Sequence, residues 1–285
     1  MPVIAVVNRK GGSGKSTFVA HVAAWCALQG HSVMLGDVDR QQSSRTWLRR
    51  RDAALPSIAP WAMDQKNMLR VPTGITHVVL DTPGGIHGFE LARIVMFADA
   101  IVMPVCPSVF DRESAAACHS ELMALPRVAS GRCRLAAVGM RVDGRTSAAE
   151  TLRLWALGLE VPFIGALRET QLYVRSLERG LTIFDLPPHH ATADLAQWQP
   201  ILDWMRPVLM PPQAANDSPG DIRHAASRLR TSRPESLMPA QESMLPGSRL
   251  NVIATRPPAT AYHAPVRTLP RAGEKGKEIP QFLKR

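Results

Sequence analysis

The residues with the clearest chemical meaning form a glycine loop near the start of the chain, Lys10-Gly11-Gly12-Ser13-Gly14-Lys15-Ser16-Thr17. Glycines let backbone N–H groups turn inward around phosphate oxygens, and the helix expected after the loop adds free N–H groups and a favourable dipole. We expect Lys15 to reach the β- and γ-phosphates of ATP, Ser16 to ligate Mg²⁺, and Thr17 to bond an α-phosphate oxygen. The alternative is a glycine-rich turn without a ligand.

A second lysine, Lys10, stands at the entrance of this loop. It is not needed to hold phosphate within its own chain, and we expect it to point away from the loop. In a face-to-face dimer it would reach the nucleotide of the partner chain, as an arginine finger does. An ordinary surface lysine is the alternative.

Carboxylates follow two further apolar stretches. Asp37 and Asp39 are one residue apart in an extended segment and therefore point the same way, so one can face a metal and the other an attacking water. Their alternative role is that of turn and helix-capping residues. Asp81 ends the apolar run of residues 77–80 and is followed by Gly84 and Gly85. A buried strand ending in aspartate is typical of a carboxylate that holds Mg²⁺ through water, and the two glycines provide a hinge.

The elements that must position these residues alternate along residues 1–206. We predict strands over 2–7, 32–36, 76–80, 100–105, 135–142 and 163–167. We predict helices over 16–29, 43–54, 112–125, 147–157, about 170–178, and 191–206. This order predicts an α/β fold of the P-loop NTPase type, a mostly parallel twisted sheet with helices on both faces. Ligands of such sheets bind beyond the carboxyl ends of the strands, where all the motifs above fall.

Composition divides the chain in two. Residues 207–285 hold twelve of the 24 prolines, with twelve Lys/Arg against six Asp/Glu, and are predicted to be a disordered basic tail behind an ATPase domain over 1–206. The net charge of +10 favours polyanionic partners, nucleic acid before an anionic membrane. The four cysteines form no CxxC pair, which argues against a zinc site or disulfide framework. With no signal peptide and no membrane span seen, a cytoplasmic protein is predicted.

Three segments in this order, KGGSGKS, DVDRQQS and LDTPGG, resemble the deviant Walker A ATPases of the ParA/MinD superfamily. Residues 163–185 add a likeness to the ParF-like and MipZ-like partition and positioning ATPases of the ParA group, so the resemblance covers about 1–206. It implies that Lys10 is the signature lysine, that Asp39 positions the hydrolytic water, and that Asp37 is its metal-side companion. The family's glutamine is Gln41 or Gln42, while Met140 stands where many relatives have an asparagine near the base.

The resemblance also implies a function. Family members of this kind are Mg²⁺-dependent ATP hydrolases, so we expect this protein to hydrolyse ATP slowly and to dimerise on ATP binding. We also expect it to bind DNA without sequence preference, to be stimulated by a partner protein, and to position DNA or another cargo at the nucleoid. Arg168, Arg175 and Arg179 are candidate DNA contacts, with solvated helix charges as the alternative.

Two other functions remain open on the sequence. A MinD-like membrane-associated positioning ATPase needs a C-terminal amphipathic helix, and residues 278–285 are short and contain Pro280. Membrane binding is therefore not expected. A metabolic role, as in nitrogenase iron-protein relatives or amide-forming synthetases, would need cysteine contexts or substrate pockets that the sequence does not show.

Overall fold

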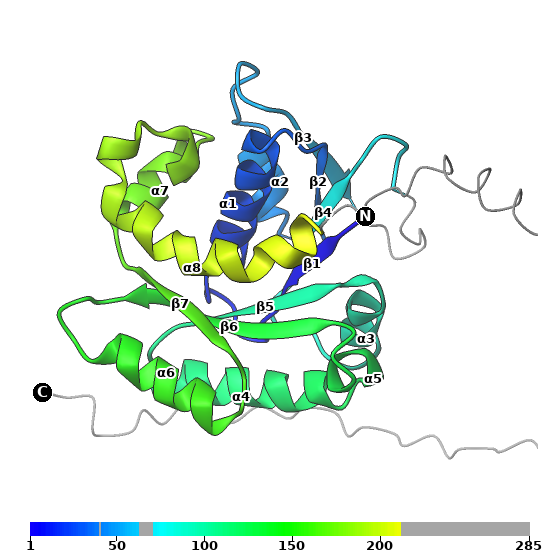
Figure 1. Ribbon diagram of the computed structural model, residues 1–285, viewed down its shortest axis with the longest axis vertical. Coiled ribbons are helices and arrows are strands. Elements are labelled where there is room, and N and C mark those ends of the chain that lie inside the picture. Colours follow the sequence, from blue (N-terminus) through cyan, green and yellow to red (C-terminus); the bar gives the residue numbers. More distant parts are fainter. Residues whose placement is uncertain (40, 63–70, 212–285) are drawn as a thin grey trace, which may run out of the picture. The chain divides into compact units, whose positions relative to one another are not determined.

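One parallel sheet organises the protein. The computed structural model describes residues 1–39, 41–62 and 71–211, and there seven strands pair in the order β3-β2-β4-β1-β5-β6-β7 (Figure 1). The strands are β1 (Val3–Val6), β2 (Val33–Asp37), β3 (Ile58–Ala62), β4 (His77–Asp81), β5 (Ala100–Val105), β6 (Arg134–Val142) and β7 (Phe163–Arg168). Every pairing is parallel. The predicted α/β fold is confirmed for the described residues. The predicted tail of residues 207–285 lies outside the described residues from position 212 onward.

Helices cover both faces of the sheet. They are α1 (Lys15–Leu28), α2 (Ser43–Leu48), α3 (Gly88–Phe97), α4 (Val109–Met123), α5 (Pro126–Ala129), α6 (Ala148–Gly158), α7 (Gln171–Glu178), η1 (Ile183–Asp185), η2 (Pro188–His190) and α8 (Thr192–Leu209). One buried core joins the sheet to α1, α2, α7 and α8, and a second joins it to α3, α4, α5 and α6 (Figure 1). In the described residues no helix is both long and apolar enough to cross a membrane.

The strands separate these two cores by alternation. In β1, Ile4 and Val6 belong to the core under α1, while Val3 and Ala5 belong to the core over α3 and α4. Successive side chains of a strand point to opposite faces, so a strand that is apolar throughout is stable only when both faces are covered. This explains why the short apolar runs of the sequence become interior strands.

The sequence prediction lacks the short helices α5, η1 and η2, and it also lacks two longer elements, strand β3 and helix α3. Strand β3 contains Pro60, which lacks an N–H for a sheet ladder, but β3 is an edge strand that pairs with β2 alone. Helix α3 follows the glycine pair after β4, and its buried Leu91, Ile94 and Val95 have helical spacing. The signal for α3 is therefore present in the sequence, whereas the signal for β3 is masked by its proline.

Two predicted helices differ in length. Helix α2 is predicted to reach residue 54 but ends at Leu48, after which backbone bonds from Arg50 to Trp47 and from Arg51 to Leu48 tighten the chain into turns. Helix α8, predicted to end at 206, continues through Pro207 to Leu209, whose side chain is buried.

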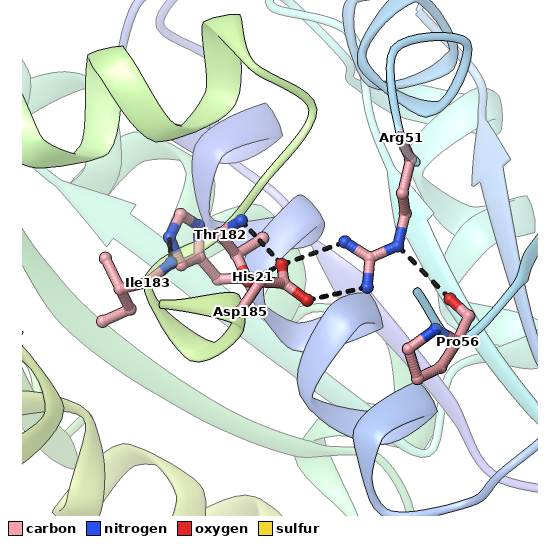
Figure 2. A network of polar contacts seen from close by, with 6 residues as sticks. All are labelled: His21, Arg51, Pro56, Thr182, Ile183 and Asp185. Carbon is pink, nitrogen blue, oxygen red and sulfur yellow. Dashed lines mark hydrogen bonds and ion pairs between the residues drawn. The ribbon is translucent and has the colours of Figure 1, made fainter. Parts of the chain in front are cut away.

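A buried histidine, His21, joins α1 to η1 (Figure 2). The Nδ1–H of His21 donates to the carbonyl of Thr17 at 2.7 Å, and its Nε2 accepts from the backbone N–H of Ile183 at 3.3 Å. Its ring stacks on Trp198 with centroids 5.4 Å apart. Burial lowers the pKa of His21 to about 4, so the ring is neutral at physiological pH.

The low pKa of buried His21 leads us to expect that the folded protein loses stability in mild acid. In the unfolded chain the His21 ring takes up a proton near pH 6.5, whereas in the folded protein it takes up a proton only near pH 4. The free energy of unfolding should therefore fall as pH drops through this window, by up to roughly 3 kcal/mol from this group. Urea unfolding of wild type and His21→Gln between pH 4.5 and 7.5 measures it, and the variant should show the shallower pH dependence. If the free energy of unfolding fell equally steeply with pH in both proteins, the low pKa of His21 would be wrong, because the other buried histidines are the same in both.

Candidate nucleotide-binding site

The site lies at the carboxyl ends of the central strands. Parallel register places Asp37 of β2 beside Asp81 of β4, and Asp81 beside Val6 of β1, so the glycine loop after β1 faces both carboxylates. Gly14 starts α1 with a φ of 92°, and a Cβ there would lie 2.7 Å from the Met140 side chain. The left-handed backbone is the reason for glycine here, because the Met140 methyl group that a Cβ would meet can move aside.

A cavity of about 530 Å³ opens over the loop. It is lined by Gly11, Gly12, Gly14, Lys15, Ser16, Thr17, Asp39, Gln41, Ser43, Gly84 and Arg141. The structure thus brings Asp39 and the hinge glycine Gly84 to the predicted phosphate loop. Of the two candidate glutamines, Gln41 lines the cavity, while Gln42 caps α2 and accepts from Arg45. Ser13 lies beneath, buried, and its hydroxyl has no partner among the described residues.

Lys15 is a buried cation at the floor of this cavity. Its residue is 7% exposed, and its ammonium donates to the carbonyl of Lys10 at 3.1 Å. Burial lowers its pKa, against the opposing attraction of Asp81 and Asp39. A positive charge held in this way, with one neutral acceptor, favours the arrival of an anion.

Two carboxylates share a single hydroxyl group below the loop. The Ser44 Oγ lies 2.9 Å from Oδ2 of Asp37 and 2.7 Å from Oδ2 of Asp81, yet a hydroxyl can donate to only one of them. Burial is the main reason why the pKa of Asp81 is raised to about 6, and its Oδ1 is buried with no partner among the described residues. Oxygen ligands with unbalanced negative charge fit Mg²⁺, which Asp81 and Ser16 would hold. Ser44 was missed by the sequence analysis.

Asp37 and Asp39 also order the loop between β2 and α2. Asp37 accepts the backbone N–H groups of Asp39 at 3.1 Å and of Arg45 at 3.0 Å, and Asp39 accepts that of Gln41 at 3.0 Å. These bonds fit the turn-residue alternative for both aspartates. Asp39 nevertheless lines the cavity, whereas Asp37 is buried. The metal role of Asp37 and the water-positioning role of Asp39 stay predictions. Arg40, which follows Asp39 in this segment, lies outside the described residues.

Lys10 is not a free surface lysine. Its ammonium pairs with Asp111 in the first turn of α4 at 2.8 Å, and the side chain is 37% exposed. Ser108, the cap of α4, also bonds to Asp111. Lys10 therefore lies on the rim of the site, and it must leave Asp111 to reach a second chain.

The glycine pair after β4 is fastened to the loop entrance. The backbone N–H of Gly85 donates to the carbonyl of Arg9 at 2.5 Å, and a Cβ at Gly84 would lie 3.3 Å from the backbone of Gly11. Glu121 of α4 pairs with the Arg9 guanidinium and accepts the N–H of Gly88 at 2.5 Å. These contacts connect the entrance of the glycine loop to the start of α3. Glu121 carries no sequence motif and could not have been singled out.

The three candidate DNA-contact arginines differ in their surroundings. Arg168 forms two hydrogen bonds of 2.8 Å to the buried carboxylate of Asp194, so its charge is already balanced. Arg175 and Arg179 are exposed on and after α7, and neither pairs with a described carboxylate. Arg168 is thus the weakest of the three candidates.

The fold and this site together define a P-loop nucleotide-binding protein. The chain matches the family described as "CobQ/CobB/MinD/ParA nucleotide binding domain" over residues 4–184, and it belongs to this family. The match confirms the ParA/MinD resemblance and supports ATP and Mg²⁺ as cofactors.

Individual relatives agree with this assignment. The chain is 37% identical over 111 residues to "Maintenance of carboxysome distribution protein A" of Gloeobacter kilaueensis, covering 38% of this chain and 51% of that protein. It therefore spans about half the length of that relative. By fold it is similar to the MinC:MinD complex of Aquifex aeolicus (TM-score 0.57, 20% identity, 72% of this chain and 96% of that chain). It is equally similar to the ATP complex of a Cyanothece McdA variant (TM-score 0.57, 12% identity, 73% and 96%).

Proposed function

We propose that this protein is a positioning ATPase that hydrolyses ATP slowly with Mg²⁺, dimerises on ATP, binds DNA without sequence preference and moves a cargo along it. Lys15 and Ser16 would bind the nucleotide and its metal, and Asp39 would orient the attacking water. A partner protein would stimulate turnover, and the protein would act in the cytoplasm on the nucleoid. The relative named for carboxysome distribution makes a protein assembly one candidate cargo, and a plasmid or chromosome partition complex is another.

The observation that carries this proposal is the exposed surface around Lys10 at the edge of the nucleotide site, because it supports the ATP-dependent dimer. Val109 and Phe110, directly beside its partner Asp111, are 49% and 72% exposed. Large apolar side chains around a half-exposed cation at the mouth of a nucleotide site favour a protein surface as their partner. A second copy of the chain, docked face to face, would cover both apolar residues and bring its own Lys10 to the first chain's phosphates.

Two variants test the dimer. Asp39→Ala should accumulate an ATP-bound dimer, because the water is no longer oriented, whereas Lys10→Ala should bind ATP within about tenfold of wild type but stay monomeric and lose turnover. Light scattering in saturating Mg·ATP and steady-state phosphate release measure the two properties, with ADP as the nucleotide control. A Lys10→Ala protein that dimerises and hydrolyses ATP normally would rule out action on the partner's nucleotide.

A further inference from the structure

A further cavity lies at the end of the sheet opposite the nucleotide site. It has a volume of about 300 Å³ and surrounds the amino end of β6, where Arg134 begins the strand. The nucleotide cavity lies beyond the carboxyl ends of the strands, and the two cavities share no lining residue. Helix α4 covers one face of the sheet and α8 covers the other, and both contribute side chains to this cavity (Figure 1).

Most of the cavity wall is apolar. Apolar side chains come from α4, α5, β6, α8 and the two residues before β7, namely Met123, Val128, Leu135, Trp204, Val161 and Pro162. Cavities of a few hundred Å³ with an apolar wall and a small number of polar groups are typical of small-molecule sites. The polar groups in this wall therefore indicate which kind of ligand fits.

The first polar group is His119 of α4, whose ring has no hydrogen-bonding partner among the described residues. The residue is 9% exposed, and its side chain lines the cavity. Burial lowers the pKa of His119, so the ring is neutral at physiological pH and offers one N–H donor and one nitrogen acceptor. A buried polar group without a partner costs free energy, and a ligand that bonds to it recovers this cost.

The second polar group is the guanidinium of Arg134. It stacks on the Trp204 ring, 4.6 Å from the ring centroid, and its Nη1 donates to the Trp204 carbonyl at 3.2 Å. None of the ion pairs among the described residues involves Arg134. Glu160 also lines the cavity, but it is exposed to solvent. A guanidinium held by a ring and a carbonyl keeps further N–H groups for a carboxylate, which it matches in shape and charge.

We infer that this cavity binds a small carboxylate with an apolar body, at a site separate from that of the nucleotide. The carboxylate accepts hydrogen bonds from the Arg134 guanidinium and from the His119 ring N–H. The apolar body packs on Trp204 and on the aliphatic side chains of the wall. Because the volume is at the lower end of the range for ligand sites, the ligand is compact.

The test uses phenylbutyrate as the probe and phenylbutanol as its uncharged analogue, with the full chain saturated with Mg·ADP so that the nucleotide cavity is filled. Ligand-detected NMR titrations measure both affinities. Wild type should bind the carboxylate at least about fivefold more tightly than the alcohol, because only the carboxylate pairs with the guanidinium.

Two arginine variants form a matched pair. Arg134→Met keeps an apolar chain against Trp204 but removes the guanidinium, so the preference for the carboxylate over the alcohol should disappear. Arg132→Met removes an exposed arginine two residues away that does not line the cavity, and it should bind both probes as wild type does.

A third variant tests the histidine. His119→Phe removes both ring nitrogens, and the cavity leaves room for the larger ring. Phenylbutyrate binding should weaken by about threefold or more, because a hydrogen bond to a charged acceptor is lost. The urea midpoint should not fall, because the wild-type ring has no partner among the described residues. A clear fall would show that the fold itself uses the ring nitrogens and would overturn their role in ligand binding.

The remaining outcomes decide the site and the class of ligand. Phenylbutyrate binding that Arg134→Met retains in full would overturn the site, as would binding to nucleotide-free protein that disappears when Mg·ADP is added. Equal affinity of wild type for the acid and the alcohol would overturn the carboxylate. Each of these results would leave the positioning ATPase standing, because ATP hydrolysis depends on residues at the other end of the sheet.

Discussion

Replacement of Lys15 by alanine is expected to weaken ATP binding by between about thirtyfold and several thousandfold. Removing a cation that forms a buried charge-assisted contact costs about 2 to 5 kcal/mol of binding free energy. Lys15 is a cation at the floor of the cavity, and among the described residues its ammonium has only the Lys10 carbonyl within hydrogen-bonding distance, so its main electrostatic partner in the loaded site would be the triphosphate. Isothermal titration with Mg·ATP and with ADP measures the loss.

The same substitution should not destabilise the protein without nucleotide. Burial already disfavours the charged form of Lys15, as its lowered pKa shows, so removing the ammonium relieves a desolvation cost. Among the described residues the Lys15 ammonium bonds to the Lys10 carbonyl and forms no ion pair, so the substitution breaks no ion pair there. The urea midpoint should therefore equal or exceed that of wild type, which separates lost binding from lost folding. Lys10→Ala is the matched control within the same loop. A Lys15→Ala protein with undiminished ATP affinity would refute the phosphate-loop assignment.

Breaking the ion pair of Arg51 with Asp185 is expected to have the largest effect on stability. The guanidinium makes two hydrogen bonds of 2.9 Å to the carboxylate, and the side chains are 4% and 0% exposed (Figure 2). Asp185→Asn leaves the arginine charge buried without a counter-charge, which costs about 3 to 5 kcal/mol. Chemical denaturation at pH 7 measures this, with Glu150→Gln as control, because its pair with Arg153 is about half exposed and worth at most about 0.5 kcal/mol.

A second variant tests the reason for this loss. Arg51→Met in the Asp185→Asn background removes the stranded charge, while the remaining amide oxygen still accepts from Thr182, which bonds to Asp185 in the wild type. More than half of the lost stability should return. If Asp185→Asn alone cost less than about 1 kcal/mol, the pair would be a solvated contact and could not fasten α2 to η1.

The sequence by itself determined the phosphate loop, the parallel sheet and the carboxylate that ends β4. These features depend on local chemistry: glycines for a left-handed turn, a lysine and hydroxyls at a helix start, and apolar runs that are stable only when covered on both faces. Each can be recognised within about ten neighbouring residues, and tertiary packing does not change its meaning.

Tertiary structure alone decided which side chains meet. Ser44 bridges to Asp81 across 37 residues and Lys10 pairs with Asp111 across 101, so neither contact leaves a trace in local spacing. Arg168 has the sequence pattern of a free cation, but Asp194, 26 residues away, balances its charge in the fold. Burial and charge balance are properties of the assembled layers, because desolvation and pairing depend on neighbours that only folding brings together.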